Sequence, residues 1–337
     1  MSKATLSNVI MACAILPLFA ANMLAGAADI PAAEVFNIII GHGTGHDSWQ
    51  YIVMQTRLPQ AITAMLCGSS LAVSGLLLQT AFRNPLAGPS IFGINSGASL
   101  GVALVMLAFG GGLTVGSVSL TGFMAVLTAA FAGASVVMAV LLLFATSVKN
   151  NVMLLIIGIM TGYIASSAIS LLNFFATEEG VHSYMVWGLG NFGGVSMSNI
   201  PTFTAVTVIG LACSLMLVKP LNMLLLGEQY AENLGVNTVA LRNKLLFVTG
   251  LLTASATAFC GPIAFIGLAV PHMARMIINT DDHRQLLPAT ITAGILVALL
   301  CNAICLLPGE SGIIPLNAIT PIMGAPVIIY VITRRRR

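Results

Sequence analysis

Long stretches without any charged side chain constrain this sequence more than any other feature. No Asp, Glu, Lys or Arg occurs between Arg83 and Lys149. About 20 apolar residues of helix cross a bilayer, so that stretch has room for two crossings. Only 7% of the 337 residues are charged, whereas soluble domains carry about 25%. Because so little polar surface remains to face water, the sequence predicts an all-α polytopic membrane protein.

The basic residues orient these crossings, because cytoplasmic loops are enriched in Lys and Arg. If Arg334–Arg337 lie in the cytoplasm, alternation backwards along the chain puts 12 of the 13 basic residues on that side, with Arg57 as the exception. We therefore expect about ten crossings and two cytoplasmic termini. The first apolar run, residues 8–28, also resembles a cleavable signal peptide, and we favour a retained helix.

Charges of both signs gather in one stretch, residues 219–244. Its middle, Glu228–Leu234, is predicted to be a short helix that Gly235 ends in a left-handed conformation. Asn237 and Thr238 are then suited to cap the next helix. Such a segment is either a docking surface for a soluble partner or an ordinary loop between membrane helices. These residues alone leave both interpretations open.

The stretch 245–274 contains 30 residues, which are too many for one crossing and too few for two. Two passes of about 15 residues each reach only about 22 Å. Gly261-Pro262 divides the stretch and Pro271-His272 interrupts its second half, so we expect a short or broken helix pair. Irregular backbone at membrane depth is buried in protein or lines a watery cavity. The stretch is thus either a transport-pathway wall or a proline-kinked helix with a packing role. The candidate wall residues are Gly261, Pro262, Phe265, Gly267, Pro271 and His272.

Several functions are disfavoured by what the sequence lacks. It contains no G-x-x-x-x-G-K-[ST] and no H-E-x-x-H, so it has neither of these nucleotide or zinc motifs. No nucleic-acid signature, C-x-x-C pair or metal site is predicted. We expect no acid, base and nucleophile set at membrane depth, which argues against an enzyme. The histidines expected on the outer side, His42, His46 and His182, are more simply solvated than metal-bound.

The energy source is expected to lie outside this chain. Carriers driven by protons or sodium usually need ionisable groups at mid-membrane, and the middles of the predicted spans have none. An ion-coupled secondary transporter of a small molecule remains the first alternative. An exporter or a membrane scaffold that moves nothing is the second.

Several motifs in register resemble those of FecCD-type permeases. They begin with Arg57-Leu58-Pro59 and Arg83-Asn84-Pro85-Leu86-Ala87, and continue with LGEQYAENLGV, GPIAFIGLAVPHMAR, DDHRQLLPA and ITPIMGAPVIIYVITRRRR. The resemblance covers about residues 50–337. FecCD-type permeases are membrane subunits of ABC importers for ferric siderophores, haem and cobalamin. The resemblance implies one transmembrane permease domain over residues 1–337, with the type II ABC importer permease fold.

The resemblance also implies partners and a mechanism. Such permeases pair as homodimers in the bacterial inner membrane and bind two cytoplasmic ATPase subunits, which hold ATP and Mg²⁺. A periplasmic or lipoprotein substrate-binding protein docks on the outer face. The permease itself has no cofactor and no catalytic residue. Closure of the ATPases on ATP is expected to tilt the two permease subunits and expose the cavity to each side in turn.

Residue roles carry over by motif. In a coupling segment at about residues 220–244, ATPase contact is implied for Gly227, Glu228, Glu232, Leu234 and Gly235. A cytoplasmic gate is implied for Asn84, Leu86, Asn150 and Asn151. A short outer helix at residues 181–192 is implied to gate the periplasmic mouth through Tyr184 and Trp187.

Docking of the binding protein is where this sequence departs from the family. The family often has a second arginine in its Arg-Leu-Pro-Arg motif, and here that position is Gln60. Docking is therefore expected either to be weaker and to depend on Arg57, or to use Glu178, Glu179 and Glu310. In the first case Arg57→Glu weakens docking in a salt-dependent way. The transported chelate is not identified by the sequence.

Overall fold

The computed structural model describes residues 3–42, 46–110, 112–115, 118–148, 151–308 and 312–334. The α-helices are α1 (Lys3–Leu24), α2 (Ala32–Ile39), α3 (Asp47–Tyr51), α4 (Leu58–Ala81), α5 (Ile94–Ala103), α6 (Phe123–Ser147), α7 (Asn151–Phe175), α8 (Glu178–Gly188), α9 (Ile200–Met216), α10 (Val218–Leu225), α11 (Glu228–Asn233), α12 (Thr238–Cys260), α13 (Ile266–Ile278), α14 (His283–Cys305) and α15 (Leu316–Arg334). Two π-helical segments, η1 (Ile52–Arg57) and η2 (Leu104–Ala108), join α3 to α4 and extend α5. The strands β1 (Gly112–Val115) and β2 (Val118–Thr121) form a short antiparallel hairpin that the sequence did not predict.

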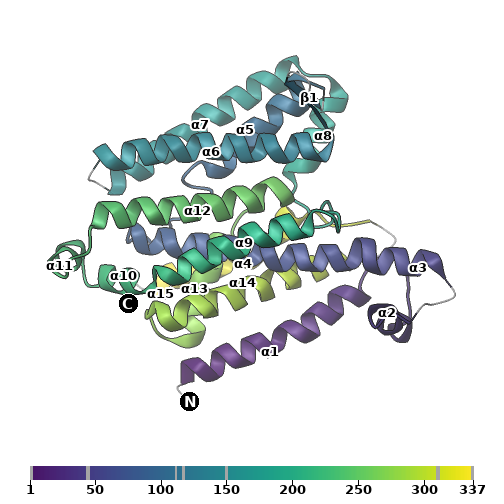
Figure 1. Ribbon diagram of the computed structural model, residues 1–337, viewed down its shortest axis with the longest axis horizontal. Helices are drawn as coiled ribbons and strands as arrows, with labels where there is room; N and C mark the ends of the chain where they lie inside the picture. Colours follow the sequence, from purple (N-terminus) through teal and green to yellow (C-terminus); the bar gives the residue numbers. More distant parts are fainter. Residues whose placement is uncertain are drawn as a thin grey trace.

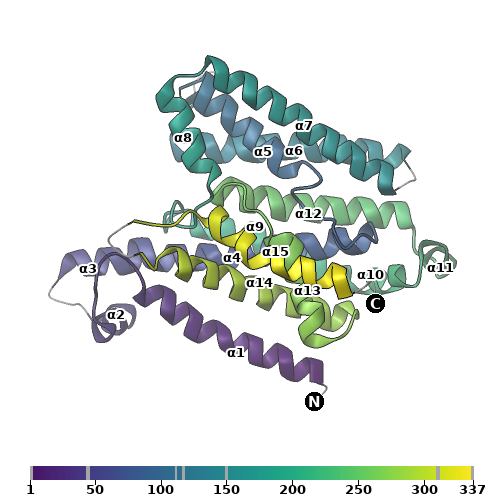
Figure 2. The same ribbon diagram turned by 180° about the vertical axis from the view of Figure 1, so that it is seen from behind.

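Within the described residues, six helices are long and apolar enough to cross a membrane. The pair α9 and α10, bent by 50°, passes the same test together, and three further apolar helices have 10–17 residues. The prediction of a polytopic helical membrane protein is thus confirmed, and the count of about ten crossings stays a prediction. Figures 1 and 2 place the start of α1, the end of α15, α10 and α11 at one end of the molecule. The opposite end carries α2, α3, α8 and the hairpin.

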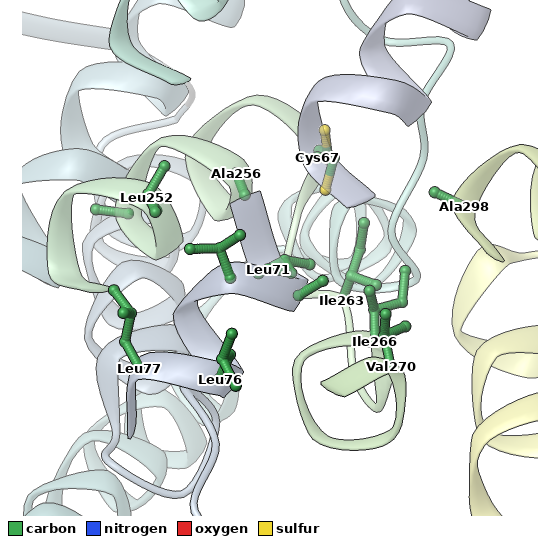
Figure 3. Packing of buried hydrophobic residues seen from close by; sticks show 14 of the residues in the cluster. Cys67, Leu71, Leu76, Leu77, Leu252, Ala256, Ile263, Ile266, Val270 and Ala298 are labelled. Atoms are coloured by element: carbon green, nitrogen blue, oxygen red, sulfur yellow. The ribbon is translucent and has the colours of Figure 1, made fainter. Parts of the chain in front are cut away.

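The core is built around α4, which α9, α12, α13 and α14 surround. Figure 3 shows Leu71 and Leu76 of α4 facing Ile266 and Val270 of α13, with Leu252 of α12 beside them. The apolar window of the span that contains α4 is 83% buried, whereas that of α7 is 17% buried. The helix α4 is therefore the central element, and α7 is peripheral in the single subunit.

Glycines set how closely α4 approaches its neighbours. A Cβ built on Gly75 would lie 1.6 Å from the carbonyl oxygen of Gly267 in α13. Pro271 lacks the N–H that would otherwise bond that carbonyl four residues earlier in the helix. A Cβ on Gly68 would similarly lie 2.3 Å from the Gly294 oxygen in α14. Small residues at both crossings thus let the helix backbones touch, as is common in membrane helix pairs.

The structure confirms a helix break after residue 260, and it differs from the expectation at Pro271. Gly261 (φ 78°) ends α12, and Phe265 (φ 66°) precedes α13. The expected short or broken helix pair is confirmed, since the short α13 of 13 residues follows this break, and α12, with 23 residues, begins seven residues before the stretch 245–274. The expected interruption at Pro271 is wrong, since α13 continues through it.

Arg242, in the first turns of α12, lies inside the helix bundle. Its side chain is 9% exposed. The guanidinium donates to the Ala145 oxygen and, at 3.0 Å, to the Val148 oxygen, at the end of α6. Helix ends carry unsatisfied carbonyls, so these bonds allow the cation to lie inside the bundle.

Candidate functional site

The coupling segment, residues 220–244, is formed as a helix, a tight turn, a second short helix and the start of α12. Gly227 has φ 122° and precedes α11, and Gly235 has φ 85° and follows it. The Asn237 side chain accepts a hydrogen bond of 2.9 Å from the Ala240 amide and caps α12. The predicted short helix, its glycine terminator and the asparagine cap are all confirmed.

The outer surface of this segment combines apolar and acidic side chains. Leu226, Tyr230 and Leu234 are 64%, 56% and 50% exposed, while Glu232 is exposed and Glu228 is half-buried. Apolar side chains grouped at a polar surface are typical of a protein interaction site.

A cavity of about 370 Å³ lies between α11 and α12. The charged side chains in its wall are Glu228, Glu232 and Arg242. Thr238 donates to the Glu232 carboxylate at 2.6 Å and links the two helices across the turn. The surface presented by α11 is thereby held against the start of α12.

Arg83 connects the end of α4 to the coupling segment. Its backbone has φ 47°, in the left-handed region that few non-glycine residues adopt. Its Nη2 donates to the Leu224 oxygen at 3.1 Å. A cation is favourable at a helix C-terminus, where carbonyls are unsatisfied, so Arg83 fastens the end of α10 to the central helix.

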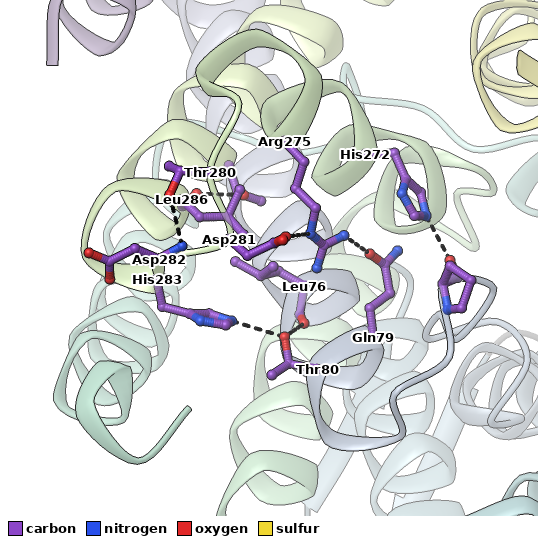
Figure 4. A network of polar contacts seen from close by, with 12 residues as sticks. Leu76, Gln79, Thr80, His272, Arg275, Thr280, Asp281, Asp282, His283 and Leu286 are labelled. Atoms are coloured by element: carbon purple, nitrogen blue, oxygen red, sulfur yellow. Dashed lines mark hydrogen bonds and ion pairs between the residues drawn. The ribbon is translucent and has the colours of Figure 1, made fainter. Parts of the chain in front are cut away.

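Asn222 connects α10 to α14. Its Nδ2 donates to the Asp282 carboxylate at 2.6 Å, and its Oδ1 accepts from the backbone N–H of His283 at 2.8 Å. The His283 ring continues to α4, since its Nε2 lies 2.9 Å from the Thr80 hydroxyl (Figure 4). A hydrogen bond from the Arg284 N–H lowers the pKa of Asp282, because it stabilises the carboxylate. Hydrogen bonds thus link α10 to α14, and α14 to α4.

A second polar link joins α4 to α13. Arg275 donates to the Gln79 Oε1 at 2.7 Å, and its Nε lies 3.4 Å from the Asp281 carboxylate. The buried His272 ring lies 2.7 Å from the Pro85 oxygen, in the turn after α4 (Figure 4). Three elements around α4, namely α10, α13 and α14, are thus tied to its last turn and the turn that follows.

The expected cytoplasmic gate residues are only partly described. Asn84 forms a local turn in which its Oδ1 accepts from the Leu86 amide at 2.9 Å, and Leu86 is 41% exposed. Asn150 lies outside the described residues. Asn151 begins α7, and its side chain is outside the described part. A gating role for these residues stays a prediction.

The expected pathway wall lies inside the subunit. His272 is 4% exposed, and a Cβ on Gly267 would lie 2.9 Å from the Leu71 oxygen. Pro262 lies in the break between α12 and α13, and Phe265 lies beside Gly324 of α15. A role in transport for these residues also stays a prediction.

Asn317, which was not among the residues expected from the sequence to form a site, holds this region together. Its Nδ2 donates to the Pro262 oxygen at 2.6 Å and to the Gly188 oxygen at 3.1 Å. Its Oδ1 accepts from the Ala264 amide at 3.1 Å. One amide in α15 thus joins the outer helix α8 to the α12–α13 break. An isolated Asn at the start of an apolar span was the available signal.

The expected docking residues fall into two groups. Glu178 and Glu179 are exposed at the start of α8, the short outer helix that the sequence predicted. In α8, the Tyr184 and Trp187 rings stack with centroids 6.2 Å apart. A gating role for these two rings stays a prediction.

Arg57 and Gln60 are not at the surface, and the expectation of an exposed cation there is wrong. Arg57 is 5% exposed and donates to the Met23 oxygen at 2.8 Å, at the end of α1, and to the Ala28 oxygen. Gln60 is 9% exposed and donates to the Asn302 side chain at 3.0 Å. The carbonyls after α1 thus hold the guanidinium inside the subunit. Whether Arg57→Glu changes docking stays a prediction.

The described residues contain no group of three or more His, Cys, Asp or Glu side chains arranged to hold a metal ion. His42, His46 and His182 are all exposed. The His46 ring lies beside Trp49, with centroids 4.3 Å apart.

Comparison with known proteins gives consistent matches over almost the whole chain. A sequence model of the FecCD transport family matches residues 13–334. The vitamin B12 import system permease protein BtuC of Citrobacter koseri is 34% identical over 290 residues, which are 86% of this chain and 84% of that protein. The protein of the same name from Salmonella typhi is also 34% identical, over 86% of this chain and 85% of that protein.

Solved structures match as well. One, described as an inward-facing conformation of a metal-chelate type ABC transporter, superposes with a TM-score of 0.83 at 27% identity, over 97% of this chain and 98% of that one. PsaBC from Streptococcus pneumoniae in complex with Fab has a TM-score of 0.52 at 13% identity, over 81% of this chain and 90% of that one, and shares the fold.

Proposed function

The chain belongs to the FecCD transport family, as a permease subunit of an ABC importer of the FecCD/BtuC type, and from that membership we propose that it carries a bulky metal chelate across the bacterial inner membrane. The chelate class comprises ferric siderophores, haem and cobalamin. Cobalamin is the first to test, because the relatives that are 34% identical are named for vitamin B12 import.

The observation that carries this proposal is the way the coupling segment is held. Its exposed apolar and acidic side chains offer a surface for a soluble ATPase, and Arg83 and Asn222 connect that surface to α4 and α14. ATP and Mg²⁺ bind in the separate ATPase subunit. Closure of two such subunits pushes α10 and α11, and the attached spans tilt to give alternating access. This chain supplies no catalytic group.

A homodimer is supported by the exposed side of α7. Leu171 and Phe174 are 61% and 81% exposed there, and Ser166, Ser167 and Ser170 are exposed beside them. Hydroxyl groups gain little from lipid tails, whereas small polar residues are common where membrane helices associate. A second copy packed on α7 gives these serines a protein or watery environment instead of lipid.

The orientation of the subunit in the membrane follows from the proposed contact between the coupling segment and the ATPase. The end that carries α10, α11 and both described termini faces the cytoplasm, where the ATPase is. The end that carries α8 faces the periplasm, where the exposed pair Glu178 and Glu179 is available to basic residues of a periplasmic or lipoprotein substrate-binding protein.

The test is co-purification with the cognate ATPase and ATPase activity in lipid, with binding protein loaded with cobalamin, ferric siderophore or haem. Glu228→Lys and Glu232→Lys are expected to weaken ATPase association at least about ten-fold, as charge reversal at an interface does. The matched controls Glu178→Lys and Glu179→Lys, at the opposite end, should leave ATPase association unchanged. One loaded ligand should change the ATPase rate and so identify the chelate.

The result that would overturn the proposal is the absence of a complex with any ATPase. Uptake that follows an ion gradient without ATPase would then favour an ion-coupled secondary transporter. Equal loss of ATPase association in all four variants would instead mean that the coupling segment is not the docking surface.

A further inference from the structure

An apolar groove of about 910 Å³ opens between the last turns of α6, the end of α9 and the first turns of α12. Its walls include Leu142, Leu143, Met216 and Phe247. Leu143, Met216 and Phe247 are 71%, 82% and 60% exposed, so the groove faces outward from membrane-spanning helices. Its size falls within the roughly 300–1,000 Å³ of ligand pockets. Lipid acyl chains are apolar and therefore match the chemistry of these walls.

A cation lies in this apolar groove. Lys244 lines it and is exposed. It follows the first residue of α12 by six positions, which places its Cα about 9 Å along the helix axis. Within the described ranges no carboxylate lies at ion-pair distance from its ammonium group. An ionisable side chain inside a span is costly and usually marks a site with a partner of opposite charge.

Two neighbours make the groove end more polar. The side-chain oxygen of Asn243, which also lines the groove, is buried without a hydrogen-bond partner in the described part of the chain. The exposed Lys219 follows the lining residue Leu217 by two positions. The groove walls are therefore mainly apolar, and Lys244 and the amide of Asn243 are the polar groups contributed by α12.

We propose that this groove binds an anionic phospholipid, with an acyl chain along the apolar walls and the phosphate on Lys244. The charge and the apolar length together favour a lipid over a second protein copy, since only a lipid offers a chain of methylenes that ends in an anion. The long lysine side chain reaches the headgroup level by extending along the apolar surface.

The proposal is tested with a tryptophan placed in the groove, Phe247→Trp, and the full chain in phosphatidylcholine vesicles. Brominated acyl chains quench tryptophan on contact, and the signal of the parent chain, from Trp49 and Trp187, is subtracted. Brominated-chain phosphatidylglycerol is expected to reach half-quenching at about one fifth of the mole fraction needed by brominated-chain phosphatidylcholine, from the attraction of one lysine near the surface. Leu143→Trp, on the α6 wall, serves if Phe247→Trp does not fold.

The control distinguishes this site from general attraction to a charged surface. Lys244→Gln should abolish the preference for phosphatidylglycerol. Arg284→Gln, an exposed cation outside the groove, should retain it. If both lipids quench the Phe247→Trp variant equally while Lys244 is intact, the proposal is overturned. Absence of quenching by either lipid would also overturn it, because the groove would then be covered by protein.

Discussion

At the scale of single residues, Gly75 decides whether α4 and α13 can cross at their observed distance. The position where its Cβ would lie is 1.6 Å from a backbone oxygen, which no side-chain rotation can relieve. The helices themselves would have to separate, and in the process they would disturb the Arg275–Gln79 link beyond the crossing.

We expect Gly75→Ala to lower the free energy of unfolding by about 2 kcal/mol or more, the upper range for overpacked cores. The measurement is an unfolding titration with SDS in mixed micelles. Gly188→Ala is the matched control, since nothing lies within 4 Å of the added methyl group. Equal stability of the two variants would contradict the observed helix distance.

Asn317 is a second residue whose role is visible only in three dimensions. Asn317→Leu leaves the Ala264 amide and the Pro262 and Gly188 oxygens without their partner. The loss of a partner costs about 1–3 kcal/mol for a fully buried group and less for half-buried groups such as these. Faster hydrogen exchange at Ala264 and a loss of at least about 2 kcal/mol are expected. Asn173→Leu is the control, because the Asn173 oxygen is buried without a partner among the described residues. Unchanged exchange at Ala264 would refute the link.

Arginine positions show where reasoning from sequence failed at this scale. The rule that arginine lies at the water side holds for Arg83, which is exposed, and fails for Arg57 and Arg242. Both buried guanidiniums bind carbonyls at the C-terminal end of another helix. Those carbonyls are 34 and 94 residues away in sequence, so no local pattern could indicate them.

At the scale of elements, the coupling segment follows local rules and was predictable. Positive φ at Gly227 and Gly235 and the cap at Asn237 involve residues no more than three apart. The break at Gly261 was predictable for the same reason. The burial of Arg242, near the start of α12, was not predictable, because it depends on carbonyl groups at the end of α6.

Removal of the cap tests this element. Asn237→Ala is expected to destabilise the start of α12 by about 1 kcal/mol, with faster hydrogen exchange at the Ala240 amide. Asn233→Ala, at the exposed end of α11, is the matched control and should leave that amide unchanged. If the Ala240 amide exchanges at the same rate in the two variants, the Asn237 cap does not stabilise the start of α12.

At the scale of the whole molecule, the helices are unequally covered. The central span is 83% buried, whereas the spans of α1 and α7 are 11% and 17% buried, so the single subunit leaves two of its described spans almost bare. Of these two, α7 carries the exposed serines Ser166, Ser167 and Ser170. A surface of that kind in lipid, with serines along it, is the place where a second copy would complete the structure.

A cysteine in that surface tests the homodimer. In a Cys13→Ser background, which removes the exposed native thiol, Ser167→Cys is expected to form a disulfide-linked dimer in oxidised membranes. Residues near a two-fold axis meet their own copies. Met216→Cys, exposed in the groove by α12, should remain monomeric. If only Met216→Cys forms disulfide-linked dimers, the dimer interface does not lie on α7.

The sequence by itself determined the membrane class, the coupling segment with its caps, the break at Gly261 and the family. The membrane class, the caps and the break depend on hydropathy or on groups a few residues apart, whereas the family was indicated by the resemblance of several motifs in register along the chain. Only the folded chain shows that Arg57 and Arg242 are buried, that Asn317 joins α8 to the α12–α13 break, and that Lys244 lies in an apolar groove. The reason is physical: the cost of burying a polar group depends on which distant carbonyl or amide meets it, and only the folded chain specifies that partner.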